Sequence, residues 1–282
     1  MNFHREPITF VGQVNLKVQN IERALAFYQE IIGFKVLEKT ERKVHLTADG
    51  KTVLLSIEQP ENVLPKQGRT TGLYHFALLL PERSDLAKIV QHFIENRFQI
   101  GSADHLVSEA LYLSDPDGNG IEIYVDRHPS KWDWDKGEVA MANDPINFPE
   151  LLSGVKPHTW NGLPAGTVMG HIHLHVSELK TTEEFYTKGL GLEVVNRYGN
   201  QALFLSDGKY HHHIALNTWN GVGAPKPFPN SAGLESFTLM LPNEEKKHKM
   251  IAQLKSIGAT VMEENGSVIA IDPSGNRIQL RV

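Results

Sequence analysis

Histidine provides most of the chemical capacity of this chain, which has 14 histidines and no cysteine among 282 residues. Without cysteine there is no disulfide, thiolate ligand or cysteine nucleophile, so a bound metal must be held by histidine, carboxylate or other oxygen ligands. Histidines alternate along 171–175 (HIHLH), which places them on one face of an expected strand, and three are consecutive at 211–213. His75 lies in an apolar segment, and Glu122 lies between two isoleucines and is expected to face away from the apolar layer. These positions are candidates for metal binding or acid–base catalysis.

The chain contains an internal repeat, which decides its architecture. The segment that begins at Val11 resembles the segment that begins at Met169, and identical residues are separated by a constant 158 positions. The matching residues of the first segment are Gly12, Leu16, Val18, Phe27, Tyr28, Gly33 and Val36. Later segments also match, with DPDGNGIEI from Asp115 opposite DPSGNRIQL from Asp272. We therefore divide the chain into two domains, 8–127 and 169–282, joined by a connection over 128–168 that is rich in proline and tryptophan.

Each half divides again into two units with the order βαβββ. In the first unit we expect a strand at 13–18, a helix at 20–32 and strands at 35–37, 44–47 and 53–58. In the second we expect a strand at 74–80, a helix at 81–96 and further strands that include 111–114 and 121–125. Units three and four begin near Met169 and Leu234. The pattern predicts an α+β protein.

Four βαβββ units, with Phe-Tyr in the first helix and DPxGNxIE near the end of a half, resemble the vicinal oxygen chelate superfamily. This superfamily includes glyoxalase I, antibiotic-resistance binding proteins and extradiol dioxygenases. The resemblance implies two cupped mixed sheets, each built from two units, with a metal in the cup. It covers nearly the whole chain apart from the connection.

A more specific resemblance lies in the second unit, between His105 and Glu122. There His105, Tyr112, Asp115 and Gly118 precede Glu122 in the order and approximate spacing of the extradiol ring-cleaving dioxygenase motif. The chain departs from the motif upstream of His105, where Ala103 is not among the residues usual at that position. Together with the block KYHHHIALNTW at 209–219, this motif is similar to the two-domain catechol 2,3-dioxygenase branch of the superfamily.

The resemblance implies three metal ligands, namely His75, Glu122 and His171. They come from units two and three, and neither half supplies two histidines and a carboxylate by itself. The matching positions of units one and four hold Gln13, Ser236 and Gln279. We therefore expect unit two to pair with unit three across the connection, and units one and four to form a metal-free structural pair.

Two histidines and one carboxylate are typical of Fe(II) oxygenases, because this set leaves coordination positions open. The resemblance thus implies an Fe(II) extradiol dioxygenase that acts on catechol or a substituted catechol with dioxygen, with Mn(II), Ni(II) and Zn(II) as alternative metals. His105 and Tyr112 would hydrogen-bond substrate oxygen, and His212 and His213 are candidate acid–base groups. Period two places His211 and His213 on the face of Ala215, whereas the family's acid–base histidine aligns with His212, so the choice among the three stays open.

Two other function classes occur on this fold. A glyoxalase-like lyase or isomerase that acts on thiol adducts would favour four protein ligands, with His213 as the fourth. A metal-free small-molecule binding or resistance protein needs no ligands. The motif around His105 and Tyr112 favours the dioxygenase, because a glyoxalase has no need of it.

Composition limits the partners and the location. The net charge of −5 argues against nucleic acid or an anionic membrane surface. No apolar run reaches the ~18 residues of a membrane helix, and the first residues contain no signal-like apolar core, so we expect a cytoplasmic protein. The length suits two domains of about 140 residues, and a homo-oligomer is compatible with the sequence.

Overall fold

Four βαβββ units follow one another in the computed structural model, which describes residues 2–153 and 160–282. Residues 154–159, part of the expected connection 128–168, lie outside the described residues. Unit one comprises β1 (Phe10–Lys17), α1 (Ile21–Ala26), the π-helical turn η1 (Phe27–Ile32), β2 (Lys35–Lys39), β3 (Lys43–Thr47) and β4 (Leu55–Glu58). Unit two comprises β5 (Gly72–Leu79), α2 (Arg83–Glu95), β6 (Gly101–Asp104), β7 (Ser108–Ser114) and β8 (Gly120–Asp126).

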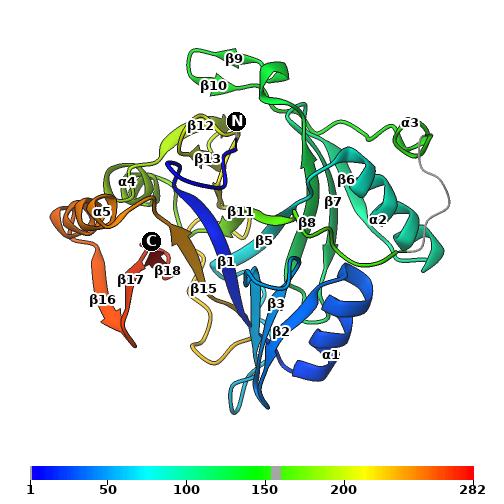
Figure 1. Ribbon diagram of the computed structural model, residues 1–282. Helices are drawn as coiled ribbons and strands as arrows, with labels where there is room; N and C mark the ends of the chain where they lie inside the picture. The colour runs from blue at the N-terminus through cyan, green and yellow to red at the C-terminus, as the bar shows by residue number, and fades with distance from the viewer. Residues whose placement is uncertain (1, 154–159) are drawn as a thin grey trace.

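The second half of the chain repeats this order of elements. In Figure 1 this half follows the connection over residues 128–168, whose described residues are drawn in green. The connection contains η2 (Pro129–Lys131), β9 (Trp134–Asp135), β10 (Glu138–Val139) and α3 (Phe148–Leu152). Unit three comprises β11 (Val168–His175), α4 (Lys180–Glu184), η3 (Phe185–Gly189), β12 (Glu193–Tyr198), β13 (Ala202–Ser206) and β14 (Ile214–Asn217). Unit four comprises β15 (Gly233–Met240), α5 (Glu244–Ser256), β16 (Thr260–Glu264), β17 (Ser267–Ile271) and β18 (Arg277–Arg281). Within the described residues, no helix is both long and apolar enough to cross a membrane.

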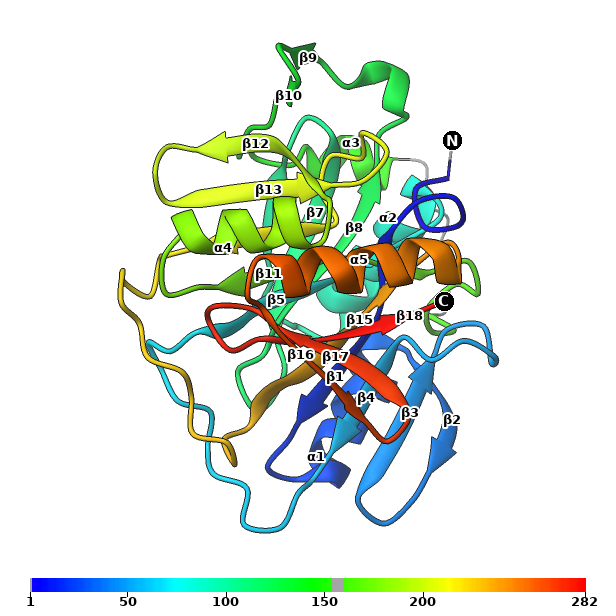
Figure 2. The same cartoon turned by 90° about the vertical axis from the view of Figure 1, so that its left-hand side faces the viewer.

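The units combine into two eight-stranded mixed sheets, and each sheet takes one unit from each half of the chain. One has the order β16-β17-β18-β15-β1-β4-β3-β2, and the other β12-β13-β14-β11-β5-β8-β7-β6. The central pairs β1–β15 and β11–β5 are antiparallel. The expected pairing of unit two with unit three is therefore confirmed. Figure 2 shows α4 and α5 side by side where units three and four meet.

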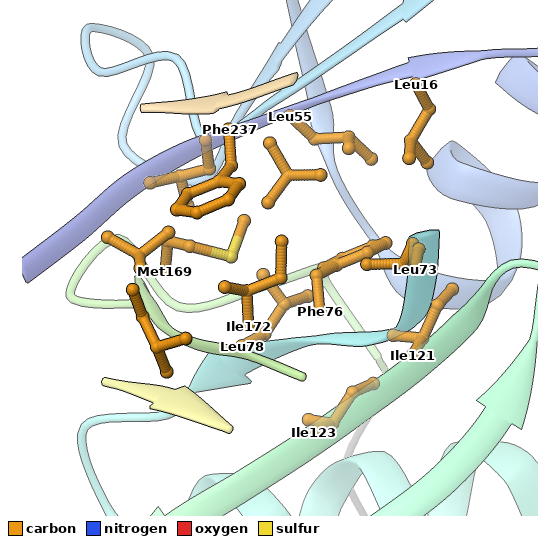
Figure 3. Packing of buried hydrophobic residues seen from close by; sticks show 14 of the residues in the cluster. Leu16, Leu55, Leu73, Phe76, Leu78, Ile121, Ile123, Met169, Ile172 and Phe237 are labelled. Carbon is orange, nitrogen blue, oxygen red and sulfur yellow. The ribbon is translucent and has the colours of Figure 1, made fainter. Parts of the chain in front are cut away.

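The main hydrophobic core joins the two sheets. Leu16, Leu55 and Phe237 of one sheet gather with Phe76 and Ile172 of the other, and all five are buried (Figure 3). Because successive strand residues point to opposite faces, burying these side chains leaves the intervening residues on the opposite faces of the sheets. Those faces carry the polar positions identified in the sequence.

The repeated Phe-Tyr and Asp-Pro motifs hold each other in place. Tyr28 donates a hydrogen bond to Asp115 over 2.8 Å, and Tyr186 makes the equivalent bond to Asp272 over 3.1 Å. Each aspartate also accepts the backbone N–H four residues later, which closes the turn before the last strand of the unit. Both motifs therefore have structural roles, and the turn at Asp115 sets the start of β8.

Gly120 is required by the close approach of β5 and β8. A methyl group there would lie 2.1 Å from the carbonyl oxygen of Tyr74 and 3.1 Å from Cβ of His75. We expect Gly120→Ala to lower the free energy of unfolding by about 2–3 kcal/mol, because backbone must move. Gly68→Ala is the control, since no atom of the described residues lies within 4 Å of its added methyl group. Urea titration of both variants measures the difference, and equal stability would disprove this role of Gly120.

Candidate metal centre

Three buried side chains converge in the cup of the sheet formed by units two and three. Oε2 of Glu122 lies 3.0 Å from Nε2 of His75 and 3.1 Å from Nε2 of His171. The two imidazole nitrogens are 3.3 Å apart. Among the described residues, this is the one group of three or more His, Asp, Glu or Cys side chains with the spacing of a metal site. The three residues come from β5, β8 and β11, the central strands of the sheet.

The donor set fits a divalent ion. Two ligands bound at right angles to one ion, each about 2.1 Å from it, lie about 3 Å apart, as these atoms do. Burial lowers the pKa of His171 to about 4, so its ring is neutral at neutral pH. Burial also opposes charge on Glu122, but His171 and His75 outweigh this effect and hold the pKa of Glu122 well below its usual value. Neutral imidazole and ionised carboxylate are the forms that bind metal ions.

A cavity of about 650 Å³ opens beside His75 and Glu122 of this cluster. Its lining also includes other sequence-predicted site residues, namely His105, Tyr112 and His212. His173 lines it as well. Most of the candidate metal-binding and acid–base residues identified in the sequence therefore line the same cavity.

His105 and Tyr112 form a hydrogen-bonded pair at the cavity wall. Nδ1 of His105 donates to the carbonyl oxygen of Ala142 over 2.7 Å, so in the neutral ring Nε2 is the acceptor. The hydroxyl of Tyr112 lies 2.6 Å from that Nε2 and donates to it. Burial, with the nearby charge of Glu122, raises the pKa of Tyr112 well above its usual value, so this hydroxyl stays protonated.

His212 is held by a hydrogen-bonded chain that runs through His211 to the partly exposed Asp126. The carboxylate of Asp126 accepts a hydrogen bond from Nε2 of His211 over 2.8 Å. In neutral His211, Nδ1 is then an acceptor, and Nδ1 of His212 lies 2.9 Å from it. With that arrangement His212 donates through Nδ1, which leaves Nε2 unprotonated, and burial lowers the pKa of His212 well below its usual value. Its ring centroid is 4.1 Å from that of His171, which places it against the metal centre.

His213, the proposed fourth ligand and acid–base candidate, has a different environment. Its Nε2 donates to the carbonyl oxygen of Phe3 over 3.0 Å, and its Nδ1 accepts from the backbone N–H of Asp207 over 3.3 Å. Neither ring nitrogen is free, and the cluster does not include it. The structure therefore does not bring His213 into the cluster, because residues 211–213 precede β14 as irregular backbone and do not follow the strand alternation expected for them.

Sequence reasoning missed two groups of residues around the site. Asp126 supports His211, and the period-two pattern of β8 was a signal for it, because residues 122, 124 and 126 share one strand face. Met141, Ala142 and Asn143 of the connection line the cavity. No local pattern marks these three, since a backbone contact between Ala142 and His105 places them there.

The cup of the other sheet holds neutral residues at the equivalent positions. In matching strand registers, the positions of His171, His75 and Glu122 are taken by Gln13, Ser236 and Gln279, respectively. Nε2 of Gln279 donates to Ser236 over 3.2 Å, and Nε2 of Gln13 donates to Ser56 over 2.9 Å. Neutral amides and hydroxyls that are hydrogen-bonded to each other are poor metal ligands. The residues of this cup therefore agree with the expected structural role of units one and four.

Buried neutral histidines should make the metal-free protein sensitive to acid. Burial lowers the pKa of six of them: His4, His171, His173, His175, His212 and His213. Such a group binds its proton more readily in the unfolded chain, so stability is lost as pH falls below the unfolded value near 6.5. Each group contributes at most about 1.4 kcal/mol per pH unit in that range.

We therefore expect the free energy of unfolding, measured by urea titration in the presence of a chelator, to fall steeply between pH 6.5 and pH 4.5. The variant His248→Gln, at an exposed position of α5, should keep the same slope. A flat profile over this range would show that the buried rings are not neutral in the folded state.

Comparison with known proteins places the chain in a family. The sequence matches the Glyoxalase/Bleomycin resistance protein/Dioxygenase superfamily over residues 11–123 and 168–280, and the chain belongs to this superfamily. Among its relatives, a catechol-2,3-dioxygenase of Bacillus subtilis (strain 168) is 46% identical over 268 residues, which cover 94% of each chain.

Two more distant relatives agree with this family. The metapyrocatechase of Pseudomonas sp. (strain CF600) is 24% identical over 75% of this chain and 71% of that protein. The crystal structure of glyoxalase I from Zea mays superimposes with a TM-score of 0.58 at 15% identity, covering 96% of this chain and 92% of that one. At this level of identity the structural match shows the common fold.

Proposed function

We propose that the protein is an Fe(II)-dependent extradiol dioxygenase that opens the ring of catechol or a substituted catechol beside its two hydroxyls. The similarity to a catechol-2,3-dioxygenase supports this reaction. The arrangement of His75, Glu122 and His171 beside the cavity supports the metal. In this reaction one carbon–carbon bond and the oxygen–oxygen bond break, and both oxygen atoms enter the product, so no further reductant is needed.

The observation that carries the proposal is a cluster of three ligands, to which the described residues add no fourth. Ala215 occupies the register position next to His173 on β14, where a fourth ligand would come from the last strand of unit three. In the other cup the equivalent residue, Ser56, does contact the equivalent of His171, which is Gln13. Ala215 has no donor atom, so a metal held here keeps positions open for substrate. When bound, Fe(II) would bring catechol and dioxygen together and pass electrons between them.

The roles that we propose for the surrounding side chains follow from their protonation. Tyr112 donates to His105, and its hydroxyl oxygen keeps a lone pair that can accept a hydrogen bond from a substrate hydroxyl. His212, with Nε2 unprotonated, is the group that can take a proton from the catechol. His211 and Asp126 orient it. Burial excludes bulk water from this end of the cavity, since Glu122 and His212 are at most 8% exposed.

The alternative functions find less support in the site. A glyoxalase-like reaction would favour a fourth protein ligand, and neither Ala215 nor the engaged ring of His213 provides one. A metal-free binding protein has no need of three mutually close ligand atoms in a buried cup, where an unpartnered charge on Glu122 would be costly.

The test is to load the protein with Fe(II) under nitrogen, add catechol and admit air. We expect a yellow ring-opened product and consumption of one dioxygen per catechol. Parallel loading with Mn(II), Ni(II) and Zn(II) identifies the active metal. Fully iron-loaded protein that consumes no oxygen with any catechol would refute the proposal.

A further inference from the structure

The cavity is much larger than catechol itself. Catechol has eight non-hydrogen atoms, and at about 30 Å³ for each it would occupy no more than about 240 Å³. The cavity measures about 650 Å³. More than half of it therefore remains when a catechol ring lies against His75 and Glu122. A substituent on the ring would fill this space.

Beyond the candidate ligands, the cavity is lined by aromatic and aliphatic side chains and by the neutral polar side chains of Ser102, Ser108, Asn143 and Asn196. Tyr74, Tyr198 and Trp219 contribute to the lining, although they are 39%, 64% and 43% exposed, respectively. The rings of Tyr74 and Trp219 meet edge to face with centroids 5.2 Å apart. Val107 and Met141 add aliphatic surface. Exposed aromatic side chains that gather at the mouth of a cavity typically cover an apolar ligand.

The described lining offers no lysine or arginine to a charged substituent. Among the described residues that line the cavity, none is lysine or arginine, and Glu122 is the one carboxylate. The nearby cation Arg127 forms an ion pair with Asp104 over 2.5 Å and does not line the cavity. A carboxylate on the substrate would therefore exchange its hydration for neutral donors such as Ser102 and Asn143, without a lysine or arginine to pair with, which is costly.

We propose that the substrates of this enzyme are catechols with an uncharged apolar ring substituent, and that catechols with a carboxylate at the same position are rejected. This inference rests on the proposed dioxygenase function, and it selects one chemical class within it. The inner end of the cavity recognises the two hydroxyls, and the aromatic mouth recognises the substituent.

A matched pair of compounds tests the proposal. The branched isopropyl and carboxylate groups are nearly the same size, so 4-isopropylcatechol and 3,4-dihydroxybenzoate differ mainly in charge, as do 3-isopropylcatechol and 2,3-dihydroxybenzoate. With iron-loaded protein we expect kcat/KM for the preferred isopropyl isomer to exceed that of catechol at least about tenfold, and that of its carboxylate partner at least about a hundredfold. Binding is measured separately under nitrogen by quenching of tryptophan fluorescence, with Trp219→Phe identifying the responding residue.

The outcomes separate this inference from the proposed function. Catechol as the best substrate, or equal binding of both members of each pair, would overturn the substrate class while leaving ring cleavage intact. Tight binding of an isopropyl compound without oxygen uptake would overturn the dioxygenase function and leave the recognition argument standing.

A variant at the mouth tests the role of charge directly. Tyr198 is 64% exposed, so Tyr198→Arg places a cation at the rim with little risk to folding. We expect it to raise kcat/KM for the better carboxylate compound at least about tenfold relative to its isopropyl partner. Tyr198→Gln removes the ring without adding charge. In this variant the isopropyl compound should still have a higher kcat/KM than its carboxylate partner. An unchanged ratio in Tyr198→Arg would contradict the view that the missing cation sets the preference.

Discussion

Replacing Glu122 with glutamine is expected to abolish stable iron binding and to lower ring-cleavage activity at least about 100-fold. The amide keeps the size of the side chain but removes the negative charge that offsets the charge of the metal. Changes that only disturb the support of a ligand typically cost 10–100-fold in affinity or activity, so loss of a ligand should cost at least as much. Iron retained after gel filtration and kcat with catechol measure the two effects.

The matched control is Gln279→Ala in the other cup. Gln279 occupies the position on β18 that Glu122 occupies on β8, and it bonds to Ser236. We expect this variant to keep its iron and its activity within a few-fold. Equal losses in both variants would mean that the catalytic pocket has been assigned to the wrong sheet.

The pairing of the units could be predicted because it followed from the identity of three residues. Neither half of the sequence contains two histidines and a carboxylate at the equivalent positions, but units two and three together do. The strand alternation around Glu122 also predicted correctly that its side chain faces away from the apolar layer, because β8 is regular and one face of it packs in the core. Patterns with a fixed period are reliable where the backbone keeps that period.

The surroundings of the ligands could not be predicted in the same way. The three histidines at 211–213 lie before β14, where the backbone is irregular, so alternation gave no guide to which ring enters the cavity. Their environments depend on contacts with distant segments, with Asp126 bound to His211 and the backbone of Phe3 bound to His213. Contacts of this kind depend on how the N-terminal segment and β8 pack against unit three, and no sequence spacing encodes them. The expected helix over residues 20–32 likewise ends in a π-helical turn from Phe27 to Ile32.

Replacing His212 with asparagine is expected to lower kcat about 100- to 1,000-fold while iron binding is retained. General acid–base catalysis typically contributes 10²–10⁴-fold, and His212 is the residue of the histidine triplet that lines the cavity. Asparagine can still hydrogen-bond to His211, but it cannot accept a proton at neutral pH. Steady-state kinetics with a saturating catechol, together with iron content, distinguish this effect from loss of the metal.

The two neighbouring histidines provide matched controls, because the structure gives the three rings different environments. His213→Asn removes a buried hydrogen bond to Phe3, so we expect reduced stability with kcat within a few-fold of the unaltered protein. His211→Asn removes the nitrogen that fixes the tautomer of His212, and Asp126→Asn removes the acceptor that fixes His211, so both should lower kcat by an intermediate factor without changing iron content. If His213→Asn proved as damaging to kcat as His212→Asn at equal iron loading, the acid–base role would belong to another member of the triplet. The orientation of the His212 ring by His211 and Asp126 would then have no effect on catalysis.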